Sequence, residues 1–304
     1  MAALGDGSDD PHILMDLDPA PPPHFLVIGV MKAGTTSLFR WLEAHPAVAE
    51  TPLKEPNFFV DDANFVADRP LAGAWAAYQG LWNRAGGSVV TGEASVRYTY
   101  PEYAQRACDR IAVAAPEARL VCVLRDPVER LRSHYRYWAQ RGREQQPLAE
   151  VVSEPGNPYV GRSRYAQVLR PYHDRFGSQL LVVVFEELVS GEGRAWEAVL
   201  EHLGLEAIPR PAGAHNVTDQ ERQFTPLARS IRRRGLLRHA DRVPAPLRRL
   251  GQRVLVRQGP EARARLAAAE QPIPPAVREL LERDTEALMA MLGWSESPWP
   301  RQPA

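Results

Sequence analysis

Residues 29–37, with the sequence GVMKAGTTS, carry the residue types of an anion-binding turn. Gly29 and Gly34 lie five positions apart, Lys32 stands between them, and three hydroxyl residues follow from Thr35 to Ser37. An apolar run over residues 25–30 precedes the turn and predicts a buried strand, and residues 34–45 predict an amphipathic helix. The free N–H groups of the first helical turn point at one spot, beside the lysine charge. The segment therefore predicts a cradle for one phosphate group.

This spacing resembles a Walker A loop, but Lys32 stands two residues before Gly34, and Thr35 follows that glycine directly. A nucleoside-triphosphate enzyme needs its lysine immediately after the glycine, beside the β- and γ-phosphates. The displaced lysine favours a different anhydride, in which one phosphate stays in the cradle and a different group is transferred.

A second strand-to-helix junction lies in residues 120–138, LVCVLRDPVERLRSHYRYW. Residues 120–124 predict a buried strand, Asp126 suits a helix N-cap, and Pro127 suits the first helical position. Arg125 then lies at the carboxyl end of a strand, and Ser133 about two turns into the helix. Ligands of open parallel sheets bind at that edge, and an arginine fork with a serine hydroxyl suits a second phosphate.

Four motifs in this order resemble the sulfotransferases that use 3′-phosphoadenosine-5′-phosphosulfate (PAPS), and most closely the heparan sulfate sulfotransferases and their bacterial relatives. The motifs are FLVIGVMKAGTTSLFRWLEAHPAV from residue 25, LKEPNFF from residue 53, GEAS from residue 92 and VLRDPVERLRSHY from residue 123. The resemblance runs from about residue 24 to about residue 205, and a weaker similarity continues to about residue 299.

The resemblance implies transfer of a sulfuryl group from PAPS, with PAP as product, to an acceptor hydroxyl or amine, without a metal. It implies that Lys32 neutralises the leaving phosphate and that the 5′-phosphosulfate is held by the cradle residues Lys32, Ala33, Gly34, Thr35, Thr36 and Ser37. It assigns the 3′-phosphate to Arg125 and Ser133. A basic loop in the family closes over that phosphate, and the run Arg232 to Gly235 is its loose match here, which makes Arg233 and Gly235 further candidates.

An acceptor hydroxyl has to lose its proton, so a general base is expected. The resemblance favours Glu55, since the heparan-type enzymes carry a catalytic glutamate just before a pair of phenylalanines, here Phe58 and Phe59. Glu93 is the second candidate, as a base or as a residue that orients the acceptor, although Ala94 replaces the lysine usual after it. His134 and His215 remain as alternatives, and Asn57 stands where relatives often have histidine.

The acceptor side of the site is predicted in the long connection after the first helix. Phe58 and Phe59 are expected to bind substrate there, and Trp75, Tyr78 and Trp82 add to an aromatic cluster that is equally consistent with core packing. Tyr165 is a further substrate-binding candidate. Such rings suit a small molecule, a glycoside, a lipid or a secondary metabolite. The sequence does not identify the acceptor or the oligomeric state.

Strands alternating with helices predict an α/β fold, P-loop-like, with three α/β/α layers and a mostly parallel central sheet. Residues 1–23 read as a flexible leader rich in Pro and Asp. Residues 24–304 read as a single domain, with an α/β core over 24–205 and an Arg-rich helical part over 206–304.

Composition restricts the class of protein. The chain has 304 residues, 37 basic and 37 acidic side chains, and 44% hydrophobic residues, so a sizeable core is available and no global basic field favours nucleic acid. Its two cysteines do not suggest a disulfide framework or a metal site, and no apolar run reaches the ~18 residues of a membrane span. We expect a cytoplasmic enzyme without a transmembrane segment.

Two other classes of function remain open. A P-loop nucleotide kinase or related phosphotransferase uses the same kind of sheet and cradle, but no lysine follows Gly34 and no Walker B aspartate is evident. An anion- or nucleic-acid-binding module built on the Arg-rich part is disfavoured by the neutral charge and by the lack of interleaved aromatic residues. Binding of Mg-ATP would favour the kinase, and salt-sensitive nucleic-acid binding without turnover would favour the module.

Overall fold

A computed structural model describes residues 23–51, 53, 55–82, 90–190, 194–211, 267 and 269–300. The strands are β1 (Phe25–Gly29), β2 (Phe65–Val66), β3 (Arg69–Pro70), β4 (Gly92–Ala94), β5 (Arg119–Leu124) and β6 (Leu180–Val184). The helices are α1 (Thr35–Glu43), α2 (Ala72–Gln79), α3 (Ala104–Ala114), α4 (Pro127–Gln140), α5 (Leu148–Val151), α6 (Pro158–Gly161), α7 (Tyr165–Phe176), α8 (Phe185–Ser190), α9 (Ala195–Leu203) and α13 (Pro275–Leu292). Short 3-10 helices cover Phe58–Val60, Asp62–Asn64, Gly80–Trp82, Val96–Thr99 and Gly177–Gln179.

The central sheet has four strands in the order β4-β1-β5-β6, and every pairing in it is parallel. Phe25 pairs with Gly92 on one side and with Arg119 on the other, so β1 lies in the interior of the sheet. All residues of β1 are buried, which explains its uninterrupted apolar sequence. The carboxyl ends of β1 and β5 lead directly into the two junctions predicted to bind phosphate.

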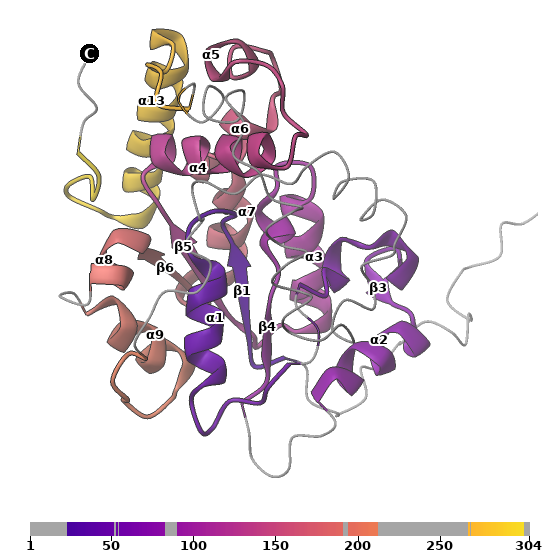
Figure 1. Ribbon diagram of the computed structural model, residues 1–304. Helices are drawn as coiled ribbons and strands as arrows, with labels where there is room; N and C mark the ends of the chain where they lie inside the picture. The colour runs from indigo at the N-terminus through magenta and orange to yellow at the C-terminus, as the bar shows by residue number, and fades with distance from the viewer. Residues whose placement is uncertain are drawn as a thin grey trace, which may run out of the picture. The chain divides into compact units, whose positions relative to one another are not determined.

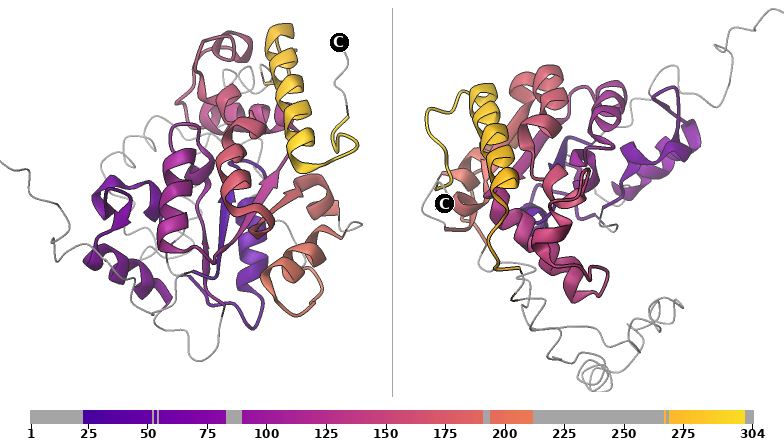
Figure 2. Two further views of the ribbon diagram at one scale, coloured as in Figure 1. Left: turned by 180° about the vertical axis from the view of Figure 1, so that it is seen from behind. Right: turned by 90° about the horizontal axis from the view of Figure 1, so that it is seen from above.

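Helices cover both faces of this sheet. Helices α1 and α9 lie over one face, and α3 and α7 pack together over the other (Figures 1 and 2). Because a parallel sheet buries both faces, its strands carry valine, leucine and isoleucine on either side. The predicted α/β fold with a mostly parallel central sheet and flanking helices is confirmed.

The chain divides into two compact units. The first contains the sheet and comprises residues up to Asp126, Arg164–His215 and Arg283–Pro303. The second comprises Pro127–Ser163 and Asn216–Glu282, and its described core joins α4, α5, α6 and the start of α13 through residues such as Leu131, Tyr135 and Leu148. The predicted division into a leader, an α/β core and an Arg-rich part stays a prediction. In the part of the chain that is described, no helix combines the length and the apolar character of a membrane span.

Predicted elements differ from the structure mainly at their ends. Periodicity predicts one helix over residues 159–176, but the chain forms α6 and α7 with a break at residues 162–164. The Asn157 side chain caps α6 by accepting from the Val160 N–H, so α6 begins at Pro158, one residue before the predicted start. The sequence also predicts a strand over residues 88–92, of which the structure describes residues 90–92, and β4 begins at Gly92.

Candidate functional site

The turn between β1 and α1 forms the predicted cradle. Gly34 precedes α1 with φ of 83°, and Lys32 also has a positive φ of 73°. A left-handed backbone is unusual for lysine and concentrates at functional sites. Gly34, the N-cap residue, contributes no side-chain hydrogen bond to α1, and the first turn of α1 holds no acidic residue. The N-terminal dipole of α1 is therefore suited to an external anion.

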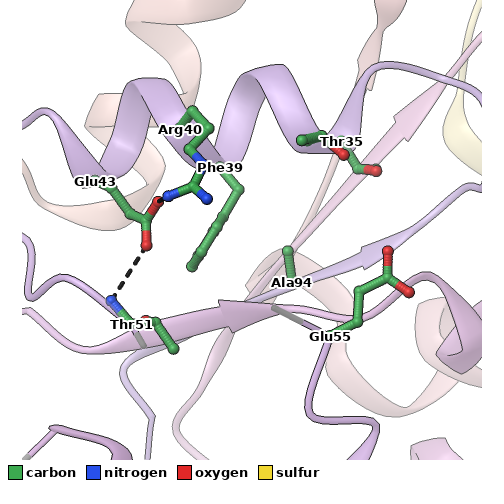
Figure 3. Close-up of a pocket in the computed structure, with 8 residues that line it drawn as sticks. Thr35, Phe39, Arg40, Glu43, Thr51, Glu55 and Ala94 are labelled. Atoms are coloured by element: carbon green, nitrogen blue, oxygen red, sulfur yellow. Dashed lines mark hydrogen bonds and ion pairs between the residues drawn. The ribbon is translucent and has the colours of Figure 1, made fainter. Parts of the chain in front are cut away.

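A pocket of about 80 Å³ opens beside this turn (Figure 3). Its lining residues are Thr35, Thr36, Phe39, Arg40, Glu43, Thr51, Glu55 and Ala94. Glu55 and Thr35 lie at one end of the pocket, and Arg40 and Glu43 lie at the other (Figure 3). Arg40 and Glu43 form an ion pair of 2.6 Å, and the Thr51 N–H donates to Glu43 Oε1 at 3.2 Å. The pocket thus joins two hydroxyls of the cradle to the predicted base.

A hydrogen-bonded loop presents Glu55. Both Glu55 and Asn57 have positive φ values, of 52° and 55°. Asn57 Nδ2 donates to the Glu55 carbonyl oxygen at 2.7 Å, and the Asn57 N–H donates to Ser95 Oγ at 3.0 Å. Asparagine tolerates this conformation better than most residues, because its short amide bonds to nearby backbone. In this chain Asn57 therefore stabilises the turn that carries Glu55.

Glu93 lies behind that loop and is completely buried. Ser95 Oγ donates to Glu93 Oε2 at 2.6 Å, and the hydroxyls of Tyr98 and Tyr78 donate to Oε1, the latter at 3.4 Å. The pKa of Glu93 is raised to about 7, mainly by burial and in smaller part by the charge of Glu55, while the three hydroxyl donors oppose the rise. Glu93 is thus held inside the protein, and Ser95 connects it by hydrogen bonds to Asn57 in the loop that carries Glu55.

Arg125 follows β5 in the sheet-containing unit. Its guanidinium lies over the Phe185 ring at 5.2 Å from the ring centroid, and its carbonyl oxygen accepts from the Tyr165 hydroxyl at 2.7 Å. Ser133, its predicted partner, is buried in α4 of the second unit. The assignment of both residues to the 3′-phosphate stays a prediction, as does that of Arg233 and Gly235, which lie outside the described residues.

The predicted substrate-binding rings are packed in the core. Phe58 stacks on Tyr78 with centroids 4.3 Å apart, and Phe59 meets Tyr98 edge-on at 5.6 Å. Neither ring is among the residues that line the pocket in the described chain. Tyr165 is also buried, with its hydroxyl on the Arg125 carbonyl. A direct role of these rings in substrate binding stays a prediction.

The two histidine alternatives have different outcomes. His134 is buried in the second unit, where its Nε2 accepts a hydrogen bond from Trp138 Nε1 at 2.8 Å. That nitrogen is already occupied, which favours a structural role. His215 lies outside the described residues.

Several residues that line the pocket were given no role in the sequence analysis. Phe39, Arg40 and Glu43 follow Thr35 and Thr36 at spacings of three and four, so the face of α1 that begins at the cradle continues along the pocket. Helical periodicity alone could have identified them. Thr51 gives no such signal: its hydroxyl donates to the Gly92 carbonyl at 3.0 Å and accepts from Trp82 Nε1 at 3.2 Å, across long stretches of sequence.

Comparison with known proteins agrees with these features. Residues 89–209 match the family model described as Sulfotransferase family. The chain is 30% identical to carbohydrate sulfotransferase 15 of Mus musculus over 43% of this chain and 30% of that protein. It is 29% identical to heparan sulfate glucosamine 3-O-sulfotransferase 3A1 of Mus musculus, over 64% of this chain and 49% of that one. The chain thus spans half or less of the length of these relatives.

The fold can be compared with a solved structure. A sulfotransferase from Alicyclobacillus acidocaldarius superposes with a TM-score of 0.59 at 22% identity, covering 91% of this chain and 98% of that one. At this identity the likeness concerns the fold alone, and the matched segment at residues 89–209 supplies the relationship in sequence. Over residues 89–209 the chain is therefore similar in sequence to the sulfotransferase family, and its fold is similar to that of a solved sulfotransferase.

Proposed function

We propose that this protein is a sulfotransferase that moves a sulfuryl group from PAPS to a hydroxyl, or an amine, of a small-molecule, glycoside or lipid acceptor. The observation that carries the proposal is the shared pocket: Glu55 and the cradle residues Thr35 and Thr36 line the same space. Transfer from a phosphosulfate to a hydroxyl needs a base and an anion cradle on opposite sides of one reacting centre.

The cradle residues fit the donor. The N-terminus of α1, whose first turn holds no acidic residue, offers its dipole and backbone N–H groups to the 5′-phosphate, and Lys32 adds a full charge from within the turn. Gly34 has no Cβ, and a Cβ there would lie 2.6 Å from two atoms of the Phe185 ring, so the backbone approaches that ring closely. We assign the phosphosulfate to Lys32, Ala33, Gly34, Thr35, Thr36 and Ser37.

When bound, the donor supplies an activated sulfuryl group whose S–O bond to the 5′-phosphate breaks as the new bond to the acceptor oxygen forms. Glu55 takes the proton from the attacking hydroxyl, so that no positive charge builds up on the acceptor oxygen as it bonds to sulfur. Lys32 and the α1 N–H groups stabilise the negative charge that collects on the departing phosphate oxygen of PAP. Alignment and charge stabilisation supply most of the acceleration in such loose transfers.

The acceptor class is drawn from the relatives and from the pocket. The names of the relatives refer to carbohydrate and to heparan sulfate glucosamine, so glycosides come first among the acceptors to be tested. Ala94 lines the pocket where the resemblance expects lysine, so one cation of the heparan-type site is replaced by a methyl group. We propose an acceptor with less negative charge than heparan sulfate.

We also propose a cytoplasmic location, because both cysteines are buried and free, as is usual for proteins of a reducing compartment.

Calorimetry with PAP in the absence of added metal tests the donor site. We expect wild-type protein to bind PAP at micromolar or lower concentration, and both Lys32→Ala and Arg125→Ala to weaken binding at least tenfold, since each removes a charge-assisted contact to a phosphate. Adenosine 5′-phosphate, which lacks the 3′-phosphate, should bind far more weakly. Arg106→Ala is the matched control, because that exposed arginine pairs with Asp62 on the surface.

The outcomes separate the alternatives. Absence of PAP binding, or equal binding of ATP with Mg²⁺, would exclude the sulfotransferase proposal and favour a phosphotransferase. With PAP binding established, radiolabelled PAPS is offered to panels of glycosides, phenols, amines and lipids, and Glu55→Gln serves as the inactive control. This variant should retain PAP binding while losing turnover about 100-fold or more, as expected for a missing general base.

A further inference from the structure

The turn that carries Arg125 is held at two backbone atoms by residues distant in sequence. The Tyr165 hydroxyl donates to the Arg125 carbonyl oxygen at 2.7 Å. The Asp126 N–H donates to Glu186 Oε1 at 3.2 Å. Phe185, next to Glu186 in sequence, lies under the Arg125 guanidinium. The first two residues of α8 therefore define both the path of this turn and the surface on which the arginine rests.

Trp299, close to the C-terminal end of the described chain, contacts both partners of the turn. Its Nε1 donates to Glu186 Oε2 at 3.1 Å, and its ring packs against the Tyr165 ring with centroids 5.9 Å apart. Trp299 is buried, and Trp294 packs edge-on against it at 6.3 Å. One side chain thus closes over the two groups that hold the backbone of Arg125 and Asp126.

The same C-terminal segment also anchors the start of α7. Asp284 Oδ2 accepts from the Ala166 N–H at 2.9 Å, directly after Tyr165. A carboxylate at this place satisfies a free N–H group of the first helical turn and complements the helix dipole. Tyr165 is therefore restrained through its neighbouring backbone as well as through its ring, and both restraints come from residues 284–299.

We propose that Trp299 is a positioning residue for donor recognition, which acts through Glu186 and Tyr165 to hold the Arg125 turn. The inference rests on the proposed function, in which Arg125 binds the 3′-phosphate of the donor. A carboxylate that accepts two hydrogen bonds is well fixed, and loss of one donor frees it to leave the other. Without Trp299 the guanidinium would sample several directions, and the 3′-phosphate would lose a pre-organised partner.

Trp299→Phe tests this directly, since it keeps a ring against Tyr165 and removes the N–H to Glu186. We expect PAP binding, measured by calorimetry, to weaken about tenfold. Binding of adenosine 5′-phosphate, measured by competition with PAP, should change less than about twofold, because this ligand has no 3′-phosphate. In an Arg125→Ala background, the same substitution should cause no further loss of PAP affinity.

Trp196→Phe is the matched control, since it also removes a buried indole N–H, which donates to the Ile208 carbonyl at 2.8 Å. If Trp299→Phe changes PAP affinity no more than this control, or weakens both nucleotides equally, the positioning role is excluded. Glu186→Gln carries the same test if Trp299→Phe does not fold, because one glutamine oxygen cannot satisfy both donors as the carboxylate does. Absence of PAP binding to wild type would instead exclude the proposed function.

Discussion

Glu93 has an unusual environment for a carboxylate, because it is completely buried. It has no exposed surface, and its two oxygens accept from Ser95, Tyr98 and Tyr78. An isolated carboxylate is costly to bury, and three hydroxyl donors compensate part of that cost. Ser95, which donates to Glu93, also accepts a hydrogen bond from the Asn57 N–H. Through Ser95, the buried Glu93 therefore supports the loop that carries the proposed base, Glu55.

The pKa of Glu93 gives the protein a specific dependence of stability on pH. Burial raises it from 4.5 to about 7, so between these values the folded state holds a proton that the unfolded state has lost. Stability from this group is therefore present at low pH and decreases as pH rises toward 7. The full difference corresponds to roughly 3 kcal/mol.

Glu93→Gln should remove this dependence, because glutamine stays neutral while keeping the shape of the side chain. In thermal unfolding between pH 5 and pH 8.5, the variant should gain stability relative to wild type as pH rises, by several degrees in Tm. Glu117→Gln on the surface is the matched control and should follow wild type. A difference between Glu93→Gln and wild type that does not vary with pH would contradict the assignment.

At the scale of elements, the junction of β1 and α1 is the feature on which the site depends. The strand ends, the backbone turns through Lys32 and Gly34 with positive φ, and α1 begins at Thr35 with no acidic residue in its first turn. The start of α8 closes this junction, since Phe185 lies against Gly34 on one side and under Arg125 on the other. A single ring therefore links the two predicted phosphate sites.

Gly34→Ala should damage this junction in two ways. A positive φ costs an alanine about 1 kcal/mol, and its Cβ would lie 2.6 Å from the Phe185 ring, which has to move. Gly204→Ala is the matched control, with φ of 67° and nothing within 4 Å of its Cβ. We expect Gly34→Ala to lower Tm more than Gly204→Ala and to weaken PAP binding, while equal effects would show that the ring contact is unimportant.

At the scale of the whole molecule, the reactivity of the two cysteines measures how often the core opens to solvent. Cys108 in α3 and Cys122 in β5 are free and buried. Burial raises the pKa of Cys108 to about 12 and raises that of Cys122 further. Since the thiolate is the reactive form, neither thiol should react in the folded protein.

A thiol reagent such as DTNB at pH 8 tests this expectation. The folded protein should react only at the rate of global opening, whereas two thiols per chain should react immediately in guanidinium chloride. The variant Cys108→Ala is the control, and only one thiol per chain should react in guanidinium chloride. Rapid labelling of either thiol in native buffer would indicate that the sheet or its α3 layer opens locally.

The sequence by itself determined the strand-to-helix junctions at Lys32 and Arg125 and the alternation of buried strands and helices, whereas the role of Glu55 as general base stays a prediction. These features depend on local rules: a strand buried on both faces is continuously apolar, and helix starts have characteristic residues. Tertiary structure alone decided the burial of Glu93, the packing of Phe58 and Phe59 in the core, and the contacts of Trp299 with Glu186 and Tyr165. Hydrophobicity is the same for a ring in a core and a ring in a pocket. Hydrogen bonds between residues more than 100 positions apart leave no periodic signal in a single chain.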